Sequence, residues 1–313
     1  MIKVMSFNIR VGSANDGDNH WNKRKSLALG RIQAFDPDLL GLQECRDDVQ
    51  AAFIRASLPD YHFLGIHRQG SGDTALEMAP LLFRKSAFVL LDRGHFWLSE
   101  TPEVPGSKSW NSVYPRTVSW VRLACQPTGT VFTYINTHFD YEPAAVDGDA
   151  HCLRQWLDLT RVQSPIILTG DFNANKDSNA YRLMTDDGAL IDAFRQIHPN
   201  EKDDGTFHAF GKLGAMAAID WILVSDHFRV LEAQIDQSRQ GNLFPSDHYP
   251  ITAVVDWKTV LARRGADDST SFQHANRSTR GALHTISGGR SGTGSVKNYT
   301  RQTSSSTAVP RPD

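Results

Sequence analysis

The sequence predicts an α/β fold in which two mainly antiparallel sheets pack face to face and helices cover their outer faces, a four-layer α/β/β/α sandwich. Three observations predict it. Short apolar segments separated by turn residues continue from Met1 to about Trp257. Many of them follow one another with no helical pattern between them. The helical patterns are also too few for a strict alternation of strand and helix, so antiparallel pairing should dominate.

The predicted strands are short runs of Val, Ile, Leu and aromatic residues between turn residues, a composition that favours extended chain. The first of them is the segment "IKVMSFNI" near the N-terminus. The predicted strands are residues 2–9, 38–43, 61–66, 79–84, 87–98, 117–124, 130–137, 165–170, 219–224, 228–236 and 250–256.

The predicted helices have apolar residues spaced so that each helix presents one face to a core. In the segment "WNKRKSLALGRIQAF" this face consists of Leu27, Leu29, Ile32 and Phe35. The predicted helices are residues 21–35, 46–58, 147–162 and 178–186.

The composition changes near the end of the last predicted strand. Residues 262–313 are rich in Ser, Thr, Gly and Arg and contain few large apolar side chains. Such a segment cannot bury enough apolar surface to offset the entropy of an ordered chain. We therefore predict one domain, residues 1–257, followed by a disordered tail, residues 262–313.

The charge, the cysteine content and the apolar runs argue against a general polyanion binder, a disulfide-stabilised protein and a membrane protein. The formal net charge of −2 gives no general attraction to polyanions. Cys45, Cys125 and Cys152 have neither metal nor redox spacing, and their odd number suits a reducing compartment. The N-terminal segment lacks the pattern of a signal peptide, and no apolar run reaches the length of a membrane span. We expect a cytoplasmic protein without a membrane anchor.

Polar side chains gather at the ends of predicted strands. Each of them has a simple structural explanation by itself, as a turn former, a solvated acid or a histidine bonded to a carbonyl group. Together they would leave many half-buried polar groups unless they satisfy one another or a cation. These residues are Asn8, Glu44, His138, Asp140, Asp171, Asn173, Asp220, Asp247 and His248.

The types of these side chains indicate a chemistry. Carboxylate and amide oxygens with no cysteine nearby suit Mg²⁺ or Mn²⁺ and disfavour zinc. His248 has Asp220 or Asp247 available to orient its ring, and His138 has other carboxylates, as proton-transfer histidines require. An oxygen-bound cation with acid-oriented imidazoles describes metal-assisted hydrolysis of a phosphate ester.

The ordered motifs resemble a known superfamily. They read "SFNIR", "GLQE", "NTHFD", "GDFNA", "TFHAFG", "IDWILV" and "SDHYPI". This set is similar to the endonuclease/exonuclease/phosphatase superfamily, which includes the DNase I-like nucleases. The segments "FWLSETP" and "SKSW", followed by "PR", are similar to bacterial relatives of the nocturnin-type and deadenylase-like branch.

The resemblance implies a metal site and a reacting centre. For the metal, Glu44 matches the acid that binds the ion, Asn8 the amide that helps to position metal and phosphate, and Asp247 a neighbouring acid.

For the chemistry, Asp171 and Asn173 match the pair at the scissile phosphate. His248 matches the essential histidine, with Asp220 as its orienting acid, and His138 matches a second histidine that contacts the phosphate. The resemblance leaves open whether His248 acts as a base or as a charged stabiliser.

Two further residues are weaker candidates for binding substrate. Glu77 has the placement of a glutamate that orients the phosphate-side histidine, which is His138 here; a surface glutamate at a strand start is the alternative. Arg116 ends a long loop rich in Pro, Gly and Ser, a length at which loops tend to be functional. Arg116 could bind a phosphate or could belong to a packed loop.

The sequence thus predicts a Mg²⁺- or Mn²⁺-dependent hydrolase of phosphate esters, of the phosphodiesterase or exonuclease type, acting on small phosphate esters or short nucleic acids. The alternatives are a phosphomonoesterase, a sphingomyelinase-like lipid phosphodiesterase and, in a different class, a catalytically silent binding domain. No obligate protein partner is evident from the sequence, and fold-level resemblance does not select the substrate.

Overall fold

The structure is a computed structural model that describes residues 1–258 apart from residues 71, 127, 162–163, 202–204 and 214–217. These residues fall within one compact unit, Met1–Leu261. The predicted disordered tail, residues 262–313, lies outside the described residues.

The described strands form two six-stranded sheets and a separate two-stranded pair. The first sheet has the order β13-β14-β1-β2-β6-β4. Its strands β1 and β2 are parallel, and all its other neighbours are antiparallel. The strands of this sheet are β1 (Ile2–Asn8), β2 (Leu39–Gln43), β4 (Tyr61–Leu64), β6 (Leu81–Arg84), β13 (Phe228–Ile235) and β14 (Ile251–Trp257).

The second sheet has the order β11-β12-β10-β9-β8-β7 and repeats this design. Its strands β9 and β10 are parallel, and its other neighbours are antiparallel. The strands of this sheet are β7 (Phe88–Trp97), β8 (Thr117–Cys125), β9 (Val131–His138), β10 (Ile166–Asp171), β11 (Leu190–Asp192) and β12 (Asp220–Ser225). The separate antiparallel pair is β3 (Cys45–Arg46) with β5 (Glu77–Met78).

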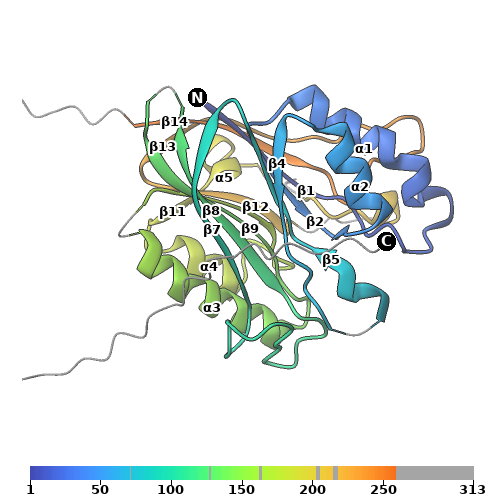
Figure 1. Cartoon of the computed structure of the whole chain (residues 1–313), viewed down its shortest axis with the longest axis horizontal. Helices are drawn as coiled ribbons and strands as arrows, with labels where there is room; N and C mark the ends of the chain where they lie inside the picture. Colours follow the sequence, from blue (N-terminus) through green and yellow to red (C-terminus); the bar gives the residue numbers. More distant parts are fainter. Residues whose placement is uncertain (71, 127, 162–163, 202–204, 214–217, 259–313) are drawn as a thin grey trace, which may run out of the picture. The chain divides into compact units, whose positions relative to one another are not determined.

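Helices α1 and α2 lie on the outer face of one sheet, and α3 and α4 lie on the outer face of the other (Figure 1). Helices α1 and α2 share an apolar cluster with the first sheet, and α3 and α4 share one with the second. The short helix α5 contacts β12 and β13. The helices are α1 (Trp21–Phe35), α2 (Val49–Ser57), α3 (Pro143–Arg161), α4 (Asn179–Thr185) and α5 (Ala193–Ile197), with short 3₁₀ turns at Gly17–Asn19, Gly72–Leu76 and Ala209–Gly211.

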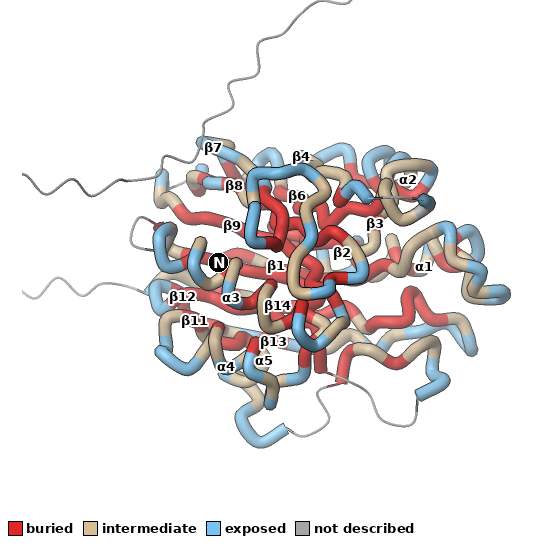
Figure 2. The backbone as a smooth tube through the Cα atoms, turned by 90° about the horizontal axis from the view of Figure 1, so that it is seen from below, coloured by how far each residue is buried: buried red, intermediate tan, exposed pale blue. Residues whose placement is uncertain are grey.

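A third apolar cluster fills the space between the two sheets. Leu39 and Phe83 of the first sheet pack there with Val121, Tyr134 and Ile222 of the second. Most of the strands in Figure 2 are accordingly buried along most of their length, while many loops and the outward helix faces are exposed. Three clusters between four layers confirm the predicted α/β/β/α sandwich.

Most of the predicted elements are present, with differences at their ends. The helix predicted from residue 147 begins at Pro143, because proline at the first helical position removes no hydrogen bond that the helix needs. The helix predicted over 46–58 begins only after Asp48, whose side chain caps it by accepting from Gln50 N. The short elements β3, β5, β11 and α5 were not predicted, because two to five residues carry too little periodicity to stand out.

The two parallel pairs position the polar strand ends. Parallel strands need a crossover, and α1 joins β1 to β2 while α3 joins β9 to β10. The carboxyl ends of each pair therefore lie side by side, which brings Asn8 next to Gln43 and His138 next to Asp171. The polar strand ends are thus brought together by the central parallel pairs as well as by antiparallel neighbours.

None of the helices in the described part of the chain combines the length and the apolar character that crossing a bilayer requires.

Candidate active site

Three predicted catalytic residues form a row across the second sheet. Asp171 at the end of β10 is the register partner of His138 on β9 and of Asp220 on β12. Register partners present their side chains on the same face of a sheet. All three side chains are buried, and Asn8 of the first sheet reaches this face, donating from Nδ2 to Asp171 Oδ2 at 2.9 Å.

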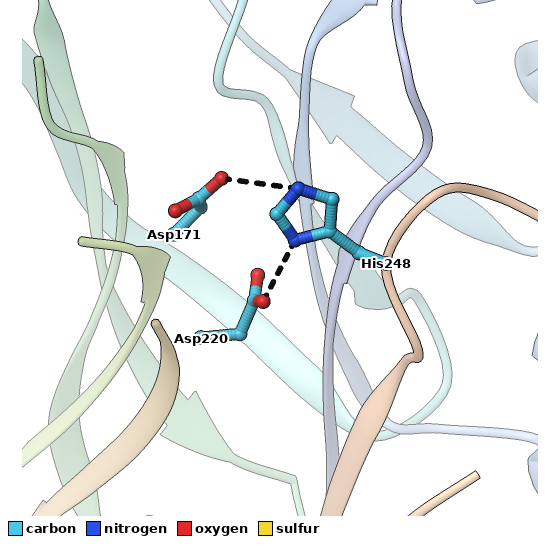
Figure 3. A group of neighbouring side chains, drawn as sticks. All are labelled: Asp171, Asp220 and His248. Carbon is cyan, nitrogen blue, oxygen red and sulfur yellow. Dashed lines mark hydrogen bonds and ion pairs between the residues drawn. The ribbon is translucent and has the colours of Figure 1, made fainter. Parts of the chain in front are cut away.

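His248 lies between two of these acids (Figure 3). Its Nδ1 is 2.8 Å from Asp220 Oδ2, and its Nε2 is 3.8 Å from Asp171 Oδ2. His248 comes from the segment just before β14, whose antiparallel pairing with β1 brings it to this end of the sandwich. The structure therefore pairs the ring with Asp220, one of the two orienting acids that the sequence allowed.

The acids around His248 determine its charge. Burial disfavours the charged ring, but Asp220 and Asp171 outweigh burial and raise the pKa of His248 to about 10. Burial and the nearby Asp220 raise the pKa of Asp171 to about 7. His248 is therefore a cation at neutral pH, and Asp171 can take up a proton there.

His138 lies on the other side of Asp171 and is neutral. Burial lowers the pKa of His138 well below its usual value, and the positive charges of Arg116 and Arg68 lower it further. Its Nε2 is 3.2 Å from Asn173 Nδ2 and 3.5 Å from Asp171 Oδ2. Because the ring is neutral, its contact with Asp171 is not an ion pair.

Asn173 has a left-handed backbone, with φ of 48°, which asparagine tolerates better than most residues. Its backbone N–H donates to Asp171 Oδ1 at 3.0 Å, and its Nδ2 also donates to Phe139 O at 2.9 Å. The turn after β10 thus aims the Asn173 side chain at the histidine.

Glu44 occupies the corner nearest the first sheet. Its Oε1 accepts from Asn8 Nδ2 at 3.0 Å, and its Oε2 accepts from Val11 N at 2.9 Å. Burial alone would raise the pKa of Glu44, but Arg10 and these hydrogen bonds outweigh it and lower the pKa. Glu44 is thus a buried carboxylate that keeps its charge.

Asn8 links the two sheets at this corner. Its Nδ2 donates to both Glu44 and Asp171, while its Oδ1 accepts from Arg10 N at 2.9 Å. In this arrangement Asn8 positions two carboxylates and does not turn its oxygen toward the space between them.

Asp247 completes the set and is almost fully buried. Its Oδ2 is 3.7 Å from Arg10 Nε, and Arg10 Nη1 is 3.7 Å from Glu44 Oε2. Arg10 also pairs with Asp16 at 3.1 Å. The three carboxylates therefore share one guanidinium, which lowers their mutual repulsion.

The donor chemistry of this corner suits a hard divalent cation. Glu44, Asp171 and Asp247 offer carboxylate oxygens, and Asp220 Oδ1 is buried without a hydrogen-bond partner among the described residues. Asp171, Asp220 and His248 each place one ligand-type atom within 4.8 Å of the others. However, Asp220 and a protonated His248 already bind each other, so this trio describes an oriented imidazole better than a set of metal ligands.

The two weaker substrate candidates have different surroundings from those expected. Glu77 Oε1 accepts from Arg68 Nη2 at 2.8 Å, and among the described residues no hydrogen bond joins Glu77 to His138. The hydrogen-bond partner of His138 is Asn173 instead. Arg116 is buried, with its Nε 3.3 Å from Asp140 Oδ2, so it belongs to the packed loop and also lies beside the site.

Several residues of the site were not assigned from the sequence. Arg10 and Arg24 support the Glu44 corner; Arg24 Nη1 donates to Ile9 O at 2.6 Å and to Pro245 O at 3.0 Å. His208 is buried and stacks on Tyr249 with ring centroids 4.0 Å apart. Arg10 and His208 stand inside the motifs "SFNIR" and "TFHAFG", which was the available signal. Arg68 stands in none of them.

Known proteins share this architecture and these motifs. The Endonuclease/Exonuclease/phosphatase family matches residues 5–248. The CCR4-Not complex 3'-5'-exoribonuclease subunit Ccr4 of Emericella nidulans is 22% identical over 340 residues, covering 80% of this chain and 50% of that protein. Nocturnin of Rattus norvegicus is 23% identical over 287 residues, covering 80% of this chain and 63% of nocturnin. The chain spans about half the length of the first relative.

One similar solved structure is matched by this chain over its whole length. The mannosyl-6-phosphatase Bt3783 of Bacteroides thetaiotaomicron is 30% identical with a TM-score of 0.74, covering 82% of this chain and 100% of that one. The similarity to nocturnin, Ccr4 and a bacterial phosphatase agrees with the branch that the motifs indicated. The chain therefore belongs to the endonuclease/exonuclease/phosphatase family.

Proposed function

We propose that this chain is a Mg²⁺-dependent phosphoesterase that acts on small phosphate esters or short nucleic acid strands. The observation that carries the proposal is the convergence of Glu44, Asp171 and His248, from three distant segments, at one end of the sandwich. The exonuclease type is supported by the Ccr4 relative, and the phosphomonoesterase alternative is supported by the mannosyl-6-phosphatase. Free cysteines throughout suit a cytoplasmic location, which is part of the same proposal.

Glu44 and Asp247 would hold the cation, and Asn8, which donates to both Glu44 and Asp171, would fix the distance between the cation site and Asp171. Their oxygen atoms match the preference of Mg²⁺, and Mn²⁺ is the natural substitute. When bound, such an ion supplies positive charge to a phosphoryl oxygen. Arg10 would keep Asp247 and Glu44 from repelling each other while the site is being loaded.

The residues of the chain divide the remaining work. Asp171 accepts a proton from the attacking water, because its pKa is raised toward neutrality. Asn173 orients the phosphoryl group and the ring of His138, which as a neutral imidazole can bond a phosphoryl oxygen. His248, held in its charged form by Asp220, stabilises the negative charge that develops on the phosphoryl group.

The proposal predicts that Asp171→Asn and His248→Ala each abolish turnover of bis-p-nitrophenyl phosphate, while circular dichroism shows an intact fold. Removal of the charge or the ring should cost at least about 100-fold in kcat. A chelator should remove wild-type activity, and added Mg²⁺ should restore it. Glu44→Ala should weaken Mg²⁺ binding measured by calorimetry.

Matched controls are the exposed residues Asp226 and His151, changed to Asn and Ala. Both controls should keep wild-type turnover. Retained turnover by either Asp171→Asn or His248→Ala would contradict the proposed active site. Binding of phosphate without hydrolysis of any ester by the wild type would favour a silent binding domain instead.

A further inference from the structure

Two arginines from different parts of the fold meet at one aromatic ring beside the site. The guanidinium carbon of Arg68 is 4.3 Å from the centroid of the Tyr114 ring, and that of Arg116 is 5.5 Å from it. Arg68 follows β4 and is tied to β5 by its backbone N–H, which donates to Glu77 O at 2.8 Å. Arg116 immediately precedes β8 of the second sheet. The two arginines therefore come from segments next to different sheets, Arg68 beside the first and Arg116 beside the second.

Both side chains are buried, with 5% and 4% of their surface exposed, yet neither guanidinium is fully engaged. Arg68 donates from Nη2 to Glu77 Oε1 and from Nε to Thr74 O. Arg116 contacts Asp140 through Nε alone, at 3.3 Å. Within the described residues, Arg68 Nη1 and both Nη atoms of Arg116 have no hydrogen-bond partner, and none of them is fully enclosed. These N–H groups are open to a ligand.

The pair lies next to the phosphate side of the site. Asp140, which contacts Arg116, is two residues after His138, and Asn173 bonds the carbonyl oxygen of Phe139 between them. The positive charges of both arginines lower the pKa of His138 after burial has done so. Arg68 and Arg116 thus act on the place where His138 would meet a phosphoryl oxygen.

Each arginine has one carboxylate beside it, Glu77 for Arg68 and Asp140 for Arg116. Asp140 is largely occupied by backbone N–H groups, accepting from those of Tyr114, Tyr141 and Glu142. Burial raises the pKa of Glu77 to about 7, so its negative charge is only partial near neutrality. Burial would raise the pKa of Asp140, but Arg116 and the backbone N–H groups lower it, so Asp140 offsets the charge of Arg116 and the positive charge that remains depends on the protonation of Glu77.

We propose that Arg68 and Arg116 form an anion-recognition pair that selects the dianionic phosphate of a monoester over the monoanionic phosphate of a diester. The inference rests on the proposed function and narrows its substrate class. A monoester phosphate carries close to two negative charges at neutral pH and three strong acceptor oxygens. In a diester, the second substituent replaces the oxygen that the arginine pair would bind. The fork of N–H donors on arginine matches phosphate oxygens in geometry as well as in charge.

The reaction is hydrolysis with no other reactant than water. The water oxygen forms a bond to phosphorus, and the bond between phosphorus and the alcohol oxygen breaks. The proton that water gives to Asp171 finally resides on the released alcohol, and the other product is inorganic phosphate.

The test compares p-nitrophenyl phosphate with bis-p-nitrophenyl phosphate in Mg²⁺, because the two esters share one leaving group and differ in the charge of the phosphate. The variants are Arg68→Gln and Arg116→Gln, and the control is Arg122→Gln, an exposed arginine on β8. The ratio of kcat/KM for the monoester to that for the diester should fall about 10- to 100-fold in both variants, the size of a lost charge-assisted hydrogen bond. It should not change in the control.

Calorimetry with inorganic phosphate in Mg²⁺ gives a readout that does not need turnover. Phosphate binding should weaken about tenfold or more in Arg68→Gln and Arg116→Gln, and dimethyl phosphate should bind the wild type more weakly than inorganic phosphate. A wild type that prefers the diester, or variants that lose both esters equally, would overturn the inference.

The two proposals fail in different ways. If the wild type hydrolyses neither ester in Mg²⁺, the proposed function fails, and phosphate binding by the variants then decides the role of the arginine pair by itself. If Arg68→Gln does not fold, as judged by circular dichroism, Arg68→Lys and Arg116→Gln carry the same comparison, because lysine keeps the charge but lacks the planar fork.

Discussion

Asp149 on α3 is a fully buried acid that no step of the chemistry uses. Its Oδ2 accepts from the backbone N–H of Asp140 at 2.9 Å, and its Oδ1 is buried without a partner among the described residues. Burial raises the pKa of Asp149 to about 8. The folded protein therefore holds Asp149 protonated across most of the neutral range, beneath the loop that carries Asp140 and Arg116.

This raised pKa predicts a pH-dependent contribution to stability. The folded state keeps the Asp149 proton up to about pH 8, whereas the unfolded state loses it near the ordinary pKa of 3.8. The stabilisation from Asp149 is thus complete below pH 3.8, declines as the pH rises, and is lost above pH 8. Asp149→Asn retains the acceptor for Asp140 N–H and does not titrate.

The difference in free energy of unfolding between Asp149→Asn and the wild type should therefore shift in favour of the variant by about 2 to 4 kcal/mol from pH 5 to pH 8. Urea unfolding at both pH values measures the difference, and subtraction removes the titration of all other groups. Parallel pH dependence of the two proteins would show that Asp149 is already ionised in the folded state.

At the scale of the elements, a polar layer joins the two sheets just beneath the site. Asn136 on β9 is two residues before His138, and Thr169 on β10 is two residues before Asp171. Asn136 Oδ1 accepts from Gln43 Nε2 at 2.8 Å and from Thr169 Oγ1 at 3.0 Å. These bonds connect strands of opposite sheets and set how closely the sheets approach.

Gly41 on β2 makes room for this layer. A Cβ at Gly41 would lie 2.3 Å from Thr169 Oγ1 and 2.4 Å from Asn136 Oδ1, both of which are held by hydrogen bonds. Gly41→Ala should therefore lower the free energy of unfolding by about 2 kcal/mol or more, as overpacking of a core does. Chemical denaturation measures the change.

The chain supplies a matched control for this substitution. Gly30 lies within α1, and no atom lies within 4 Å of a Cβ built there. Gly30→Ala should stabilise the protein by about 0.5 to 1 kcal/mol, because alanine favours a helix interior. A Gly41→Ala protein as stable as the wild type would mean that the sheets separate at no cost and that the polar layer does not fix their spacing.

At the scale of the whole molecule, the candidate site lies within one compact unit. Every candidate residue, from Asn8 to His248, lies in the described part of the chain and in the compact unit Met1–Leu261. We predict that a chain ending at residue 261 keeps the wild-type melting temperature and kcat on p-nitrophenyl esters. Loss of activity with an intact fold would assign a functional role to residues 262–313.

Prediction from the sequence succeeded where the signal is local. The strands that end in Asn8, His138 and Asp171 have long apolar runs and were found with nearly correct ends, as was α1. The buried face of α1 was predicted less well, because the helix buries Trp21, Arg24 and Ala28 with Ile32 and leaves Leu27 only half-buried. Prediction failed for β3 and β5, which are two residues long and form only because Cys45 pairs with Met78, far away in the sequence. Arg68 was missed for a related reason, since its role depends on a partner, Tyr114, that lies far away in the sequence.

The sequence by itself determined which side chains are available and that acids, amides and imidazoles end buried strands, because hydrophobic periodicity is a local property. The tertiary structure decided the partners: that Asp220 and not Asp247 bonds His248, that Asn173 and not Glu77 contacts His138, and that Arg68 and Arg116 share one ring. These pairings follow from the order of the strands within each sheet and from the packing of one sheet on the other. Neither is encoded in the pattern of any single segment, because both arise only when distant strands pack.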